Sequence, residues 1–224
     1  MNQLFLVRHG QNHANITREF SHRKIDYSLT RKGRIQASQT AQYFRSLGID
    51  EIYSSPLKRA RETAAAIGAA VHLPVTVIEE FREVNVGCLE EEPPTREAWV
   101  FFFFFFFFFL RGCHWIRFPG GESFDELRER SLRGYRLVTE GKSGKKIVVV
   151  AHGGIISFTL GEICPGIQLT DQDFALNNNC SITEVHLADF SGTFEGRLVR
   201  WASSDHLHGQ AAKFVSAVPD TEQI

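Results

Sequence analysis

The chain is poor in cysteine and carries almost no net charge, and both shortages exclude classes of protein. Its 224 residues have a formal net charge of −1 at pH 7, so no protein-wide field attracts nucleic acid or a membrane surface. The four cysteines, at positions 88, 113, 164 and 180, form no CxxC pair and no metal-ligand spacing. We therefore expect free thiols in a cytoplasmic protein and no bound metal.

Long hydrophobic segments are also missing, with one exception. No basic stretch followed by a long apolar core comes after Met1, so we expect no signal peptide. Phe101 to Phe109 is an unbroken run of nine phenylalanines, and apolar neighbours extend the block to 99–110. A membrane-spanning helix needs about 20 such residues, so we interpret the block as buried or interfacial. Hydrophobic residues at 43% exclude a disordered chain.

The pattern of apolar residues predicts an α/β fold. Runs typical of strands lie at 4–7, 51–53, 75–78, 147–151, 181–187 and 197–201, and helical patterns at 30–47, 55–70, 123–138 and from 155. Because strands alternate with helices, we expect a three-layer α/β/α sandwich with a mainly parallel central sheet. The length suits a single domain over 1–224. The segment from about 88 to 121 breaks the alternation and is predicted to be an insertion on this core.

Three of the predicted helices begin with recognisable capping residues. Thr30 suits the cap of the first. Ser55 suits the cap of the second, with Pro56 at its first helical position. Ser123 and Glu126 form a capping box for the third.

Three predicted strands end in histidine or arginine side chains. Arg8 and His9 follow the first strand, Arg59 lies after the second, and His152 follows the long strand at 147–151. In such sheets ligands bind outside the carboxyl ends of the strands. One guanidinium group can donate two parallel hydrogen bonds to two oxygens of a phosphate. A helix beginning at Pro56 adds backbone N–H groups. The sequence therefore predicts a local anion pocket in a protein without net positive charge.

Five blocks of sequence follow one another in a characteristic order between about residues 4 and 190. They are Leu6-Val7-Arg8-His9-Gly10 with Asn15, Leu29-Thr30-x-x-Gly33-x-x-Gln36-Ala37, Ser54-Ser55-Pro56-Leu57-x-Arg59-Ala60-x-x-Thr63-Ala64, Gly120-Gly121-Glu122-Ser123, and Val150-Ala151-His152-Gly153-Gly154. Together these blocks resemble the histidine phosphatase (phosphoglycerate mutase-like) superfamily. The first block alone is a weak match, but five in register are specific.

The resemblance implies a nucleophilic histidine. His9 would attack phosphorus to give a phosphohistidine, and an imidazole with a pKa of about 6.5 is largely neutral at pH 7. Other residues would hold the phosphoryl oxygens and offset charge in the transition state. These are Arg8, Arg59 and His152, with Asn15 and Gly153 as further phosphate contacts.

The resemblance also implies one carboxyl group that acts as acid and then as base. Glu83, in Phe81-Arg82-Glu83-x-x-x-Gly87, stands where the family places a glutamate. Glu79 and Glu80 are nearby alternatives. Residues 85–90 depart from the aromatic–glycine stretch that is more usual at this place, so the assignment to Glu83 stays open.

From these residues we predict a cytoplasmic phosphatase that acts on a small phosphorylated metabolite and needs no cofactor. Two alternatives are open: a cofactor-dependent phosphoglycerate mutase, and a module that binds a phosphorylated ligand without turnover. The mutases of this family carry a longer insertion with basic residues that hold a second phosphate. Arg96, Arg111 and Arg117 are the only basic residues between Glu83 and Gly120, which favours the phosphatase.

The phenylalanine run lies in the insertion where this family shapes substrate access, so the insertion is expected to act as a lid. Nine phenylalanines give an element that is apolar on every face, whereas a lid normally has a polar face. Either the run is a hydrophobic cover or homodimer contact, or it is not the natural sequence and stands for unidentified residues. We favour the second interpretation. An intact mass compared with the calculated 25.4 kDa distinguishes them.

Overall fold

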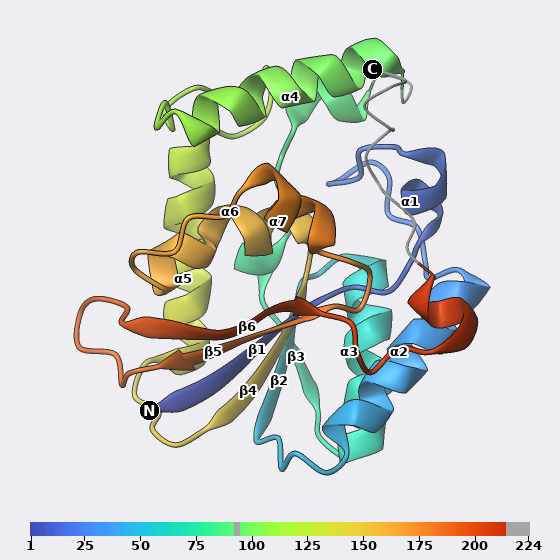
Figure 1. Cartoon of the computed structure of the whole chain (residues 1–224), viewed down its shortest axis with the longest axis vertical. Coiled ribbons are helices and arrows are strands. Elements are labelled where there is room, and N and C mark those ends of the chain that lie inside the picture. The colour runs from blue at the N-terminus through green and yellow to red at the C-terminus, as the bar shows by residue number, and fades with distance from the viewer. Residues whose placement is uncertain (92–94, 214–224) are drawn as a thin grey trace.

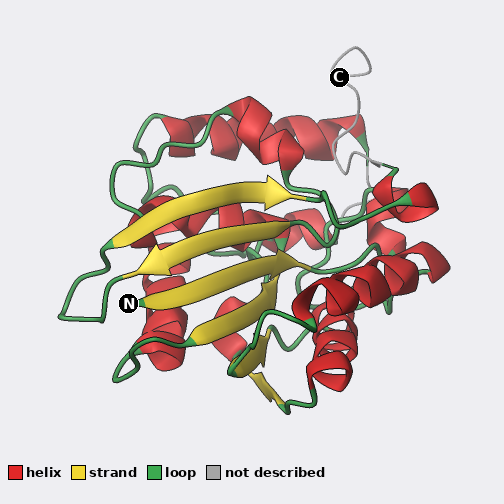
Figure 2. Ribbon diagram, turned by 60° about the horizontal axis from the view of Figure 1, so that its bottom comes forward, coloured by secondary structure: helices red, strands yellow, loops and turns green. Residues whose placement is uncertain are grey.

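The computed structural model describes residues 1–91 and 95–213, and these form a six-stranded sheet with helices on both faces (Figures 1 and 2). The strands are β1 (Asn2–Arg8), β2 (Glu51–Ser54), β3 (Val75–Val77), β4 (Lys146–Ala151), β5 (Ile182–Leu187) and β6 (Gly196–Ser203). Their order in the sheet is β3-β2-β4-β1-β5-β6. The first four strands in this order run parallel, and β5 pairs antiparallel with β1 and β6. The predicted sandwich with a mainly parallel sheet is confirmed.

The apolar residues of β1 serve both faces of the sheet. Leu4 and Leu6 belong to one buried cluster, whereas Phe5 and Val7 belong to another on the opposite face. Successive side chains of a strand point to opposite faces, which is why a strand covered on both sides is apolar throughout. The helices are α1 (His13–Thr17), α2 (Arg31–Phe44), α3 (Lys58–Val71), α4 (Arg96–Leu110), α5 (Phe124–Thr139), α6 (Gly153–Ile163) and α7 (Asp171–Leu176). Short 3-10 turns are η1 (Glu79–Phe81), η2 (Gly87–Glu90) and η3 (Gly209–Ala212).

The two apolar clusters divide these helices into layers. Residues of α2 and α3 pack on the Phe5 and Val7 face, and residues of α5 and α6 pack on the Leu4 and Leu6 face. Helix α5 begins with the expected capping box of Ser123. Helix α2 begins after Thr30, whose hydroxyl accepts from the N–H of Gly33, also as expected.

The predicted start of α3 is wrong. The helix begins at Lys58 and is capped by Leu57, which makes no side-chain hydrogen bond. The hydroxyl of Ser55 accepts from the N–H of Leu57 over 3.3 Å and also lies 2.6 Å from Nε2 of His152, but Ser55 is not the residue that directly precedes the helix. The N–H of Lys58 instead donates to Oδ1 of Asp26 over 2.9 Å. The backbone N–H of Lys58, at the start of this helix, therefore binds a side chain of the protein and is not free for an anion.

Helix α4 carries the phenylalanine run over the end of the molecule where α6 and α7 lie (Figure 1). On its inner side, Phe105 stacks on Phe118 with ring centroids 4.5 Å apart, and Phe109 packs 4.8 Å from Phe158 of α6. On its outer side, Phe104 is 53% exposed. The helix is apolar on both sides, as expected for nine consecutive phenylalanines. Among the described helices none is long and apolar enough to cross a membrane.

The N-terminal part of α2 lies directly against the loop that follows β1. A Cβ atom added to Gly33 would lie 2.0 Å from the carbonyl oxygen of Gln11, and one added to Gly10 would lie 2.7 Å from the carbonyl oxygen of Gly33. The side chain of Gln36 accepts from the N–H of Gln11 over 2.9 Å. This contact between two backbones fixes the loop that carries His9.

The Gly33→Ala variant tests this contact. The new methyl group would force two backbone segments apart, and overpacking of this kind costs about 1–3 kcal/mol of unfolding free energy. Urea denaturation measures the loss. Ser38→Ala, at an exposed position of the same helix, is the control and should stay within about 0.5 kcal/mol of the wild type. Equal stabilities of the two variants would contradict the proposed contact.

Candidate active site

The carboxyl ends of β1 and β4 place two histidines side by side. Arg8 pairs with Ala151 in the parallel register, so His9 and His152 are the next residues on neighbouring strands. Both side chains are buried, and their ring centroids are 5.2 Å apart. The structure thus brings together two residues that are 143 positions apart in the sequence, as the strand pattern predicted.

Two hydrogen bonds define the protonation of His9. Its Nδ1 lies 2.7 Å from the carbonyl oxygen of Gly10, and Nε of Arg59 donates to its Nε2 over 3.1 Å. A carbonyl only accepts and a guanidinium only donates, so His9 carries its proton on Nδ1 and a lone pair on Nε2. Burial, followed by the charges of Arg59 and Arg8, lowers the pKa of His9 well below its usual 6.5. The side chain is therefore a neutral base at pH 7.

The two arginines are each held by a carbonyl group and still have unused donors. Arg8 donates through Nη1 to the carbonyl of Asn177, and Arg59 donates through Nη2 to the carbonyl of Ser21 over 2.7 Å. Burial lowers the pKa of Arg59 to about 10 and also lowers that of Arg8. Among residues 1–91 and 95–213, Nε of Arg8 and Nη1 of Arg59 are buried without a hydrogen-bond partner. Unpaired buried donors are costly, so they indicate a ligand that supplies the missing acceptors.

His152 adds a third unpaired buried nitrogen. Its Nε2 faces the hydroxyl of Ser55, which already accepts from the N–H of Leu57 over 3.3 Å. A hydroxyl that accepts one N–H can donate its own proton to Nε2, and the proton of His152 then resides on Nδ1. That Nδ1 has no partner in the described residues. Burial, the charge of Arg59 and the charge of His9 lower the pKa of His152 well below 6.5.

Asn179, which the sequence did not indicate as a site residue, holds the backbone of His9 and the side chain of Asn15. Nδ2 of Asn179 donates to the carbonyl of His9 and to Oδ1 of Asn15, each over 3.1 Å. Oδ1 of Asn15 also accepts from the N–H of Asn12, so the amide NH2 of Asn15 is left for another acceptor. Residues 177–179 are three consecutive asparagines just before β5, the neighbour of β1, and that cluster was the available signal.

Gly153 lies against Arg8. An added Cβ would be 3.3 Å from Nε of Arg8, so a side chain at this position would crowd the guanidinium.

The N–H of Gly10 donates to Oγ1 of Thr63 over 3.0 Å, a contact that the sequence did not predict. Thr63 belongs to the same helix as Arg59, and this bond ties that helix to the loop of His9.

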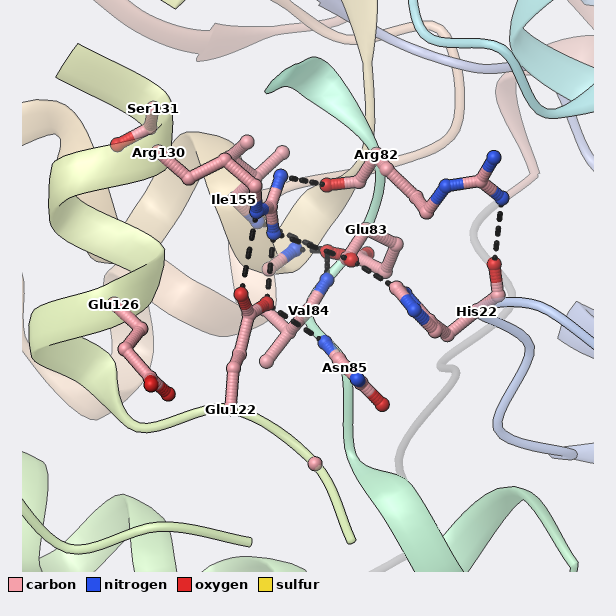
Figure 3. Close-up of polar contacts among 12 residues, drawn as sticks. His22, Arg82, Glu83, Val84, Asn85, Glu122, Glu126, Arg130, Ser131 and Ile155 are labelled. Atoms are coloured by element: carbon pink, nitrogen blue, oxygen red, sulfur yellow. Dashed lines mark hydrogen bonds and ion pairs between the residues drawn. The ribbon is translucent and has the colours of Figure 1, made fainter. Parts of the chain in front are cut away.

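Glu83 is the glutamate that the structure brings near Arg8 and Arg59, and Figure 3 shows it beside Val84 and Ile155. Its Oε1 accepts from the N–H of Ile155 over 3.0 Å and of Val84 over 2.9 Å, and its Oε2 accepts from the N–H of Gly154 over 3.1 Å. Its negative charge acts on both Arg8 and Arg59.

The alternative glutamates lie elsewhere. The side chain of Glu79 is 66% exposed and pairs with Arg82 over 2.6 Å. The side chain of Glu80 lies at Gly134 of α5. Within residues 1–91 and 95–213, no three histidine, cysteine or carboxylate side chains are grouped to hold a metal ion.

The fold and the site define an α/β protein in which two buried histidines, the buried Arg59 and the partly buried Arg8 meet at the carboxyl edge of the sheet. Comparison with known families gives the class. The model of the histidine phosphatase superfamily (branch 1) matches residues 4–200, and the chain belongs to this superfamily.

The names of the relatives include both phosphatases and a phosphoglycerate mutase. The chain is 31% identical to the uncharacterized phosphatase PhoE of Bacillus subtilis, over 74% of this chain and 79% of that protein. It is 30% identical to the probable phosphoglycerate mutase GpmB of Salmonella paratyphi B, over 94% of this chain and 97% of that protein. Among solved structures, it resembles phosphoserine phosphatase from Entamoeba histolytica in complex with 3-phosphoglyceric acid, with a TM-score of 0.73 and 26% identity. That match covers 93% of this chain and 100% of the other.

Inorganic phosphate is expected to stabilise the folded protein because it supplies acceptors for the unpaired donors. Phosphate at 100 times its dissociation constant should add about 2.7 kcal/mol of unfolding free energy. A thermal melt with and without phosphate measures this, and Arg59→Met should abolish the increase. Arg128→Met, at an exposed site on α5, should keep it. An undiminished increase in Arg59→Met would show that phosphate binds elsewhere.

The stability should fall as the pH drops below about 6.5. The folded-state pKa values of His9 and His152 are lowered, so the unfolded chain binds protons that the folded chain cannot. Each lowered pKa contributes fully to the unfolding free energy at pH values above the pKa of the unfolded chain. Below that pKa, the unfolding free energy decreases by about 1.4 kcal/mol per pH unit for each histidine. Urea denaturation at pH 7 and pH 5 measures the loss, which His152→Asn should reduce. His72→Asn, at an exposed residue, should behave like the wild type.

Proposed function

We propose that the protein is a phosphatase that hydrolyses a small phosphomonoester through a phosphohistidine at His9. The observation that carries this proposal is the lone pair on Nε2 of His9 beside three unpaired buried nitrogens. A neutral imidazole among cationic donors suits attack on a phosphoryl dianion. Metal-dependent activation of water is not needed for such a step, because the nucleophile is already present.

In the first step the Nε2 lone pair of His9 forms a bond to phosphorus while the bond to the leaving oxygen breaks. The carbonyl of Gly10 accepts from Nδ1–H and stabilises the positive charge that develops on the ring. Arg8, Arg59 and His152 donate to the phosphoryl oxygens through Nε, Nη1 and Nδ1, and the NH2 group of Asn15 adds a further donor. Nε2 of His9 accepts from Nε of Arg59, so this bond breaks as Nε2 attacks, whereas the donors to the phosphoryl oxygens are in place before the substrate arrives.

Glu83 supplies the proton and then removes one. Its carboxyl group donates a proton to the leaving oxygen in the first step. In the second step its carboxylate takes a proton from water as the water oxygen attacks phosphorus, and the N–P bond breaks to regenerate the lone pair on His9.

The insertion favours a phosphatase over a mutase. We propose that residues 88–121 form a lid on a single domain, and none of the three arginines in this lid is buried at the site. Arg96 is exposed on the outer side of α4, Arg111 lies over the ring of Phe107, and Arg117 pairs with Glu126. A mutase must retain a bisphosphate, and the described part of the lid offers no basic side chain for its second phosphate. The identity to GpmB keeps the mutase as the second candidate.

The cell compartment follows from the cysteines. All four thiols are free, and two of them, Cys164 and Cys180, are buried. Free thiols suit a reducing compartment, so we propose that the enzyme acts in the cytoplasm on a phosphorylated metabolite.

Hydrolysis of p-nitrophenyl phosphate and of an alkyl phosphate tests the proposed function. His9→Asn should be inactive on both substrates. A substrate with a radioactive phosphoryl group should label the wild type but not this variant. Glu83→Gln should lower kcat for the alkyl phosphate by about 100- to 10,000-fold, because the alkoxide needs a proton to leave. The loss should be smaller for p-nitrophenyl phosphate, whose leaving group departs as a stable anion.

Three outcomes would change the assignment. Equal rates for the wild type and His9→Asn would exclude the phosphohistidine. Binding of phosphate without turnover of any ester would indicate a binding module. With 3-phosphoglycerate and a catalytic amount of bisphosphate, isomerisation faster than phosphate release would indicate a mutase.

A further inference from the structure

Two side chains outside the anion site hold the backbone on both sides of Glu83 (Figure 3). Nη1 of Arg130 donates to the carbonyl oxygens of Glu80 over 2.6 Å and of Arg82 over 2.9 Å. Oε1 of Glu122 accepts from the N–H of Asn85 over 2.8 Å. The segment that carries the acid/base carboxylate is thus fixed before and after Glu83 by these two residues.

Arg130 and Glu122 are also bound to each other through two hydrogen bonds. Nη2 of Arg130 lies 2.7 Å from Oε1 of Glu122, and Nε lies 3.2 Å from Oε2. The two side chains are 18% and 13% exposed, whereas those of the Arg128–Glu162 pair at a neighbouring position of α5 are 48% and 28% exposed. A fork-shaped, largely buried pair has a defined geometry that an exposed pair lacks.

The chain next to Glu122 is built for close approach to this segment. A Cβ atom on Gly121 would lie 2.2 Å from the carbonyl oxygen of Asn85, and the N–H of Glu122 donates to that same oxygen over 2.9 Å. Glu122 then immediately precedes Ser123, the cap of α5, which carries Arg130 two turns later. The glycine, the cap and the ion pair together connect α5 rigidly to residues 82–85.

We propose that Arg130 and Glu122 are positioning residues that hold the Glu83 carboxylate at the distance from the phosphoryl group at which it can transfer a proton. This inference rests on the proposed function of Glu83. Neither residue touches the substrate; both act through the backbone on either side of Glu83. A displacement of about 1 Å at a reacting group can cost on the order of 100-fold in rate, so the effect on turnover is large.

The Arg130–Glu122 pair places no net charge near Glu83, because one side chain is positive and the other is negative. Other charged or titratable groups surround Glu83 from each packed element. They are Arg8 of β1, Arg59 of α3, His22 through its Nδ1 to the carbonyl of Glu83, and Arg82 beside it in the chain. Removing one member of the Arg130–Glu122 pair leaves the other charge uncompensated next to this group. The two removals therefore have opposite electrostatic effects but the same geometric effect.

The first experiment compares kcat and KM for an alkyl phosphate and p-nitrophenyl phosphate. Arg130→Met and Glu122→Gln should lower kcat for the alkyl phosphate by about 10- to 100-fold with little change in KM. The loss should be much smaller for p-nitrophenyl phosphate, which needs no proton donor. Arg130→Lys keeps the charge but not the fork, so it should restore only part of kcat.

The second experiment follows the basic limb of kcat/KM against pH, where the proton donor is lost. Glu122→Gln leaves the Arg130 charge unbalanced and should move this limb to lower pH. Arg130→Met leaves the Glu122 charge unbalanced and should move it to higher pH. Arg130→Lys should leave it in place. A residue with only a structural role would not shift the limb in opposite directions.

Arg128→Met is the matched control, since it removes an ion pair from the same helix away from residues 82–85. It should have the wild-type kcat and pH profile, and thermal melts establish that each variant is folded. If Glu83→Gln is impaired but the Arg130 and Glu122 variants behave like Arg128→Met, the positioning role is wrong while the proposed function stands. If Glu83→Gln itself has wild-type kcat on the alkyl phosphate, the proposed function of Glu83 fails first.

Discussion

The burial of two guanidinium groups beside His9 is the constraint on which the rest of the site depends. Arg59 is buried and Arg8 is partly buried close to the same imidazole, and burial of that ring, followed by the charges of Arg59 and Arg8, lowers its pKa and keeps it neutral. The protein satisfies some of their N–H groups with the carbonyls of Asn177 and Ser21 and opposes their charge with Glu83. Among the described residues, Nε of Arg8 and Nη1 of Arg59 have no acceptor, which suits the proposed anionic substrate.

The fold explains why this arrangement is built at one edge of the sheet. The register of β1 and β4 sets His9 beside His152, and α6 begins directly after β4. The first residues of that helix must be glycines, because Arg8 occupies the space at Gly153 and the Glu83 carboxylate occupies the space at Gly154. The same helix N-terminus therefore receives a carboxylate of the protein and lies beside the anion site.

The phenylalanine run of the proposed lid and the polar side chains of the anion site belong to different sets of contacts. The anion site is formed by β1, β4, α3 and the loop with Glu83, and none of its polar contacts involves the phenylalanine run. The run instead packs α4 on Phe118 and on Phe158 of α6. The polar contacts of the site are therefore independent of the residues at 101–109.

The sequence by itself determined the layers, the mainly parallel sheet and the residues of the anion site, because apolar periodicity and strand ends are local patterns. It did not determine that α3 begins at Lys58, or that the hydroxyl of Ser55 lies against His152, a residue 97 positions away. It also left Glu79, Glu80 and Glu83 open and gave no role to Asn179, Glu122 or Arg130. Only the tertiary structure decided these, because each depends on hydrogen bonds between segments that lie far apart in the chain.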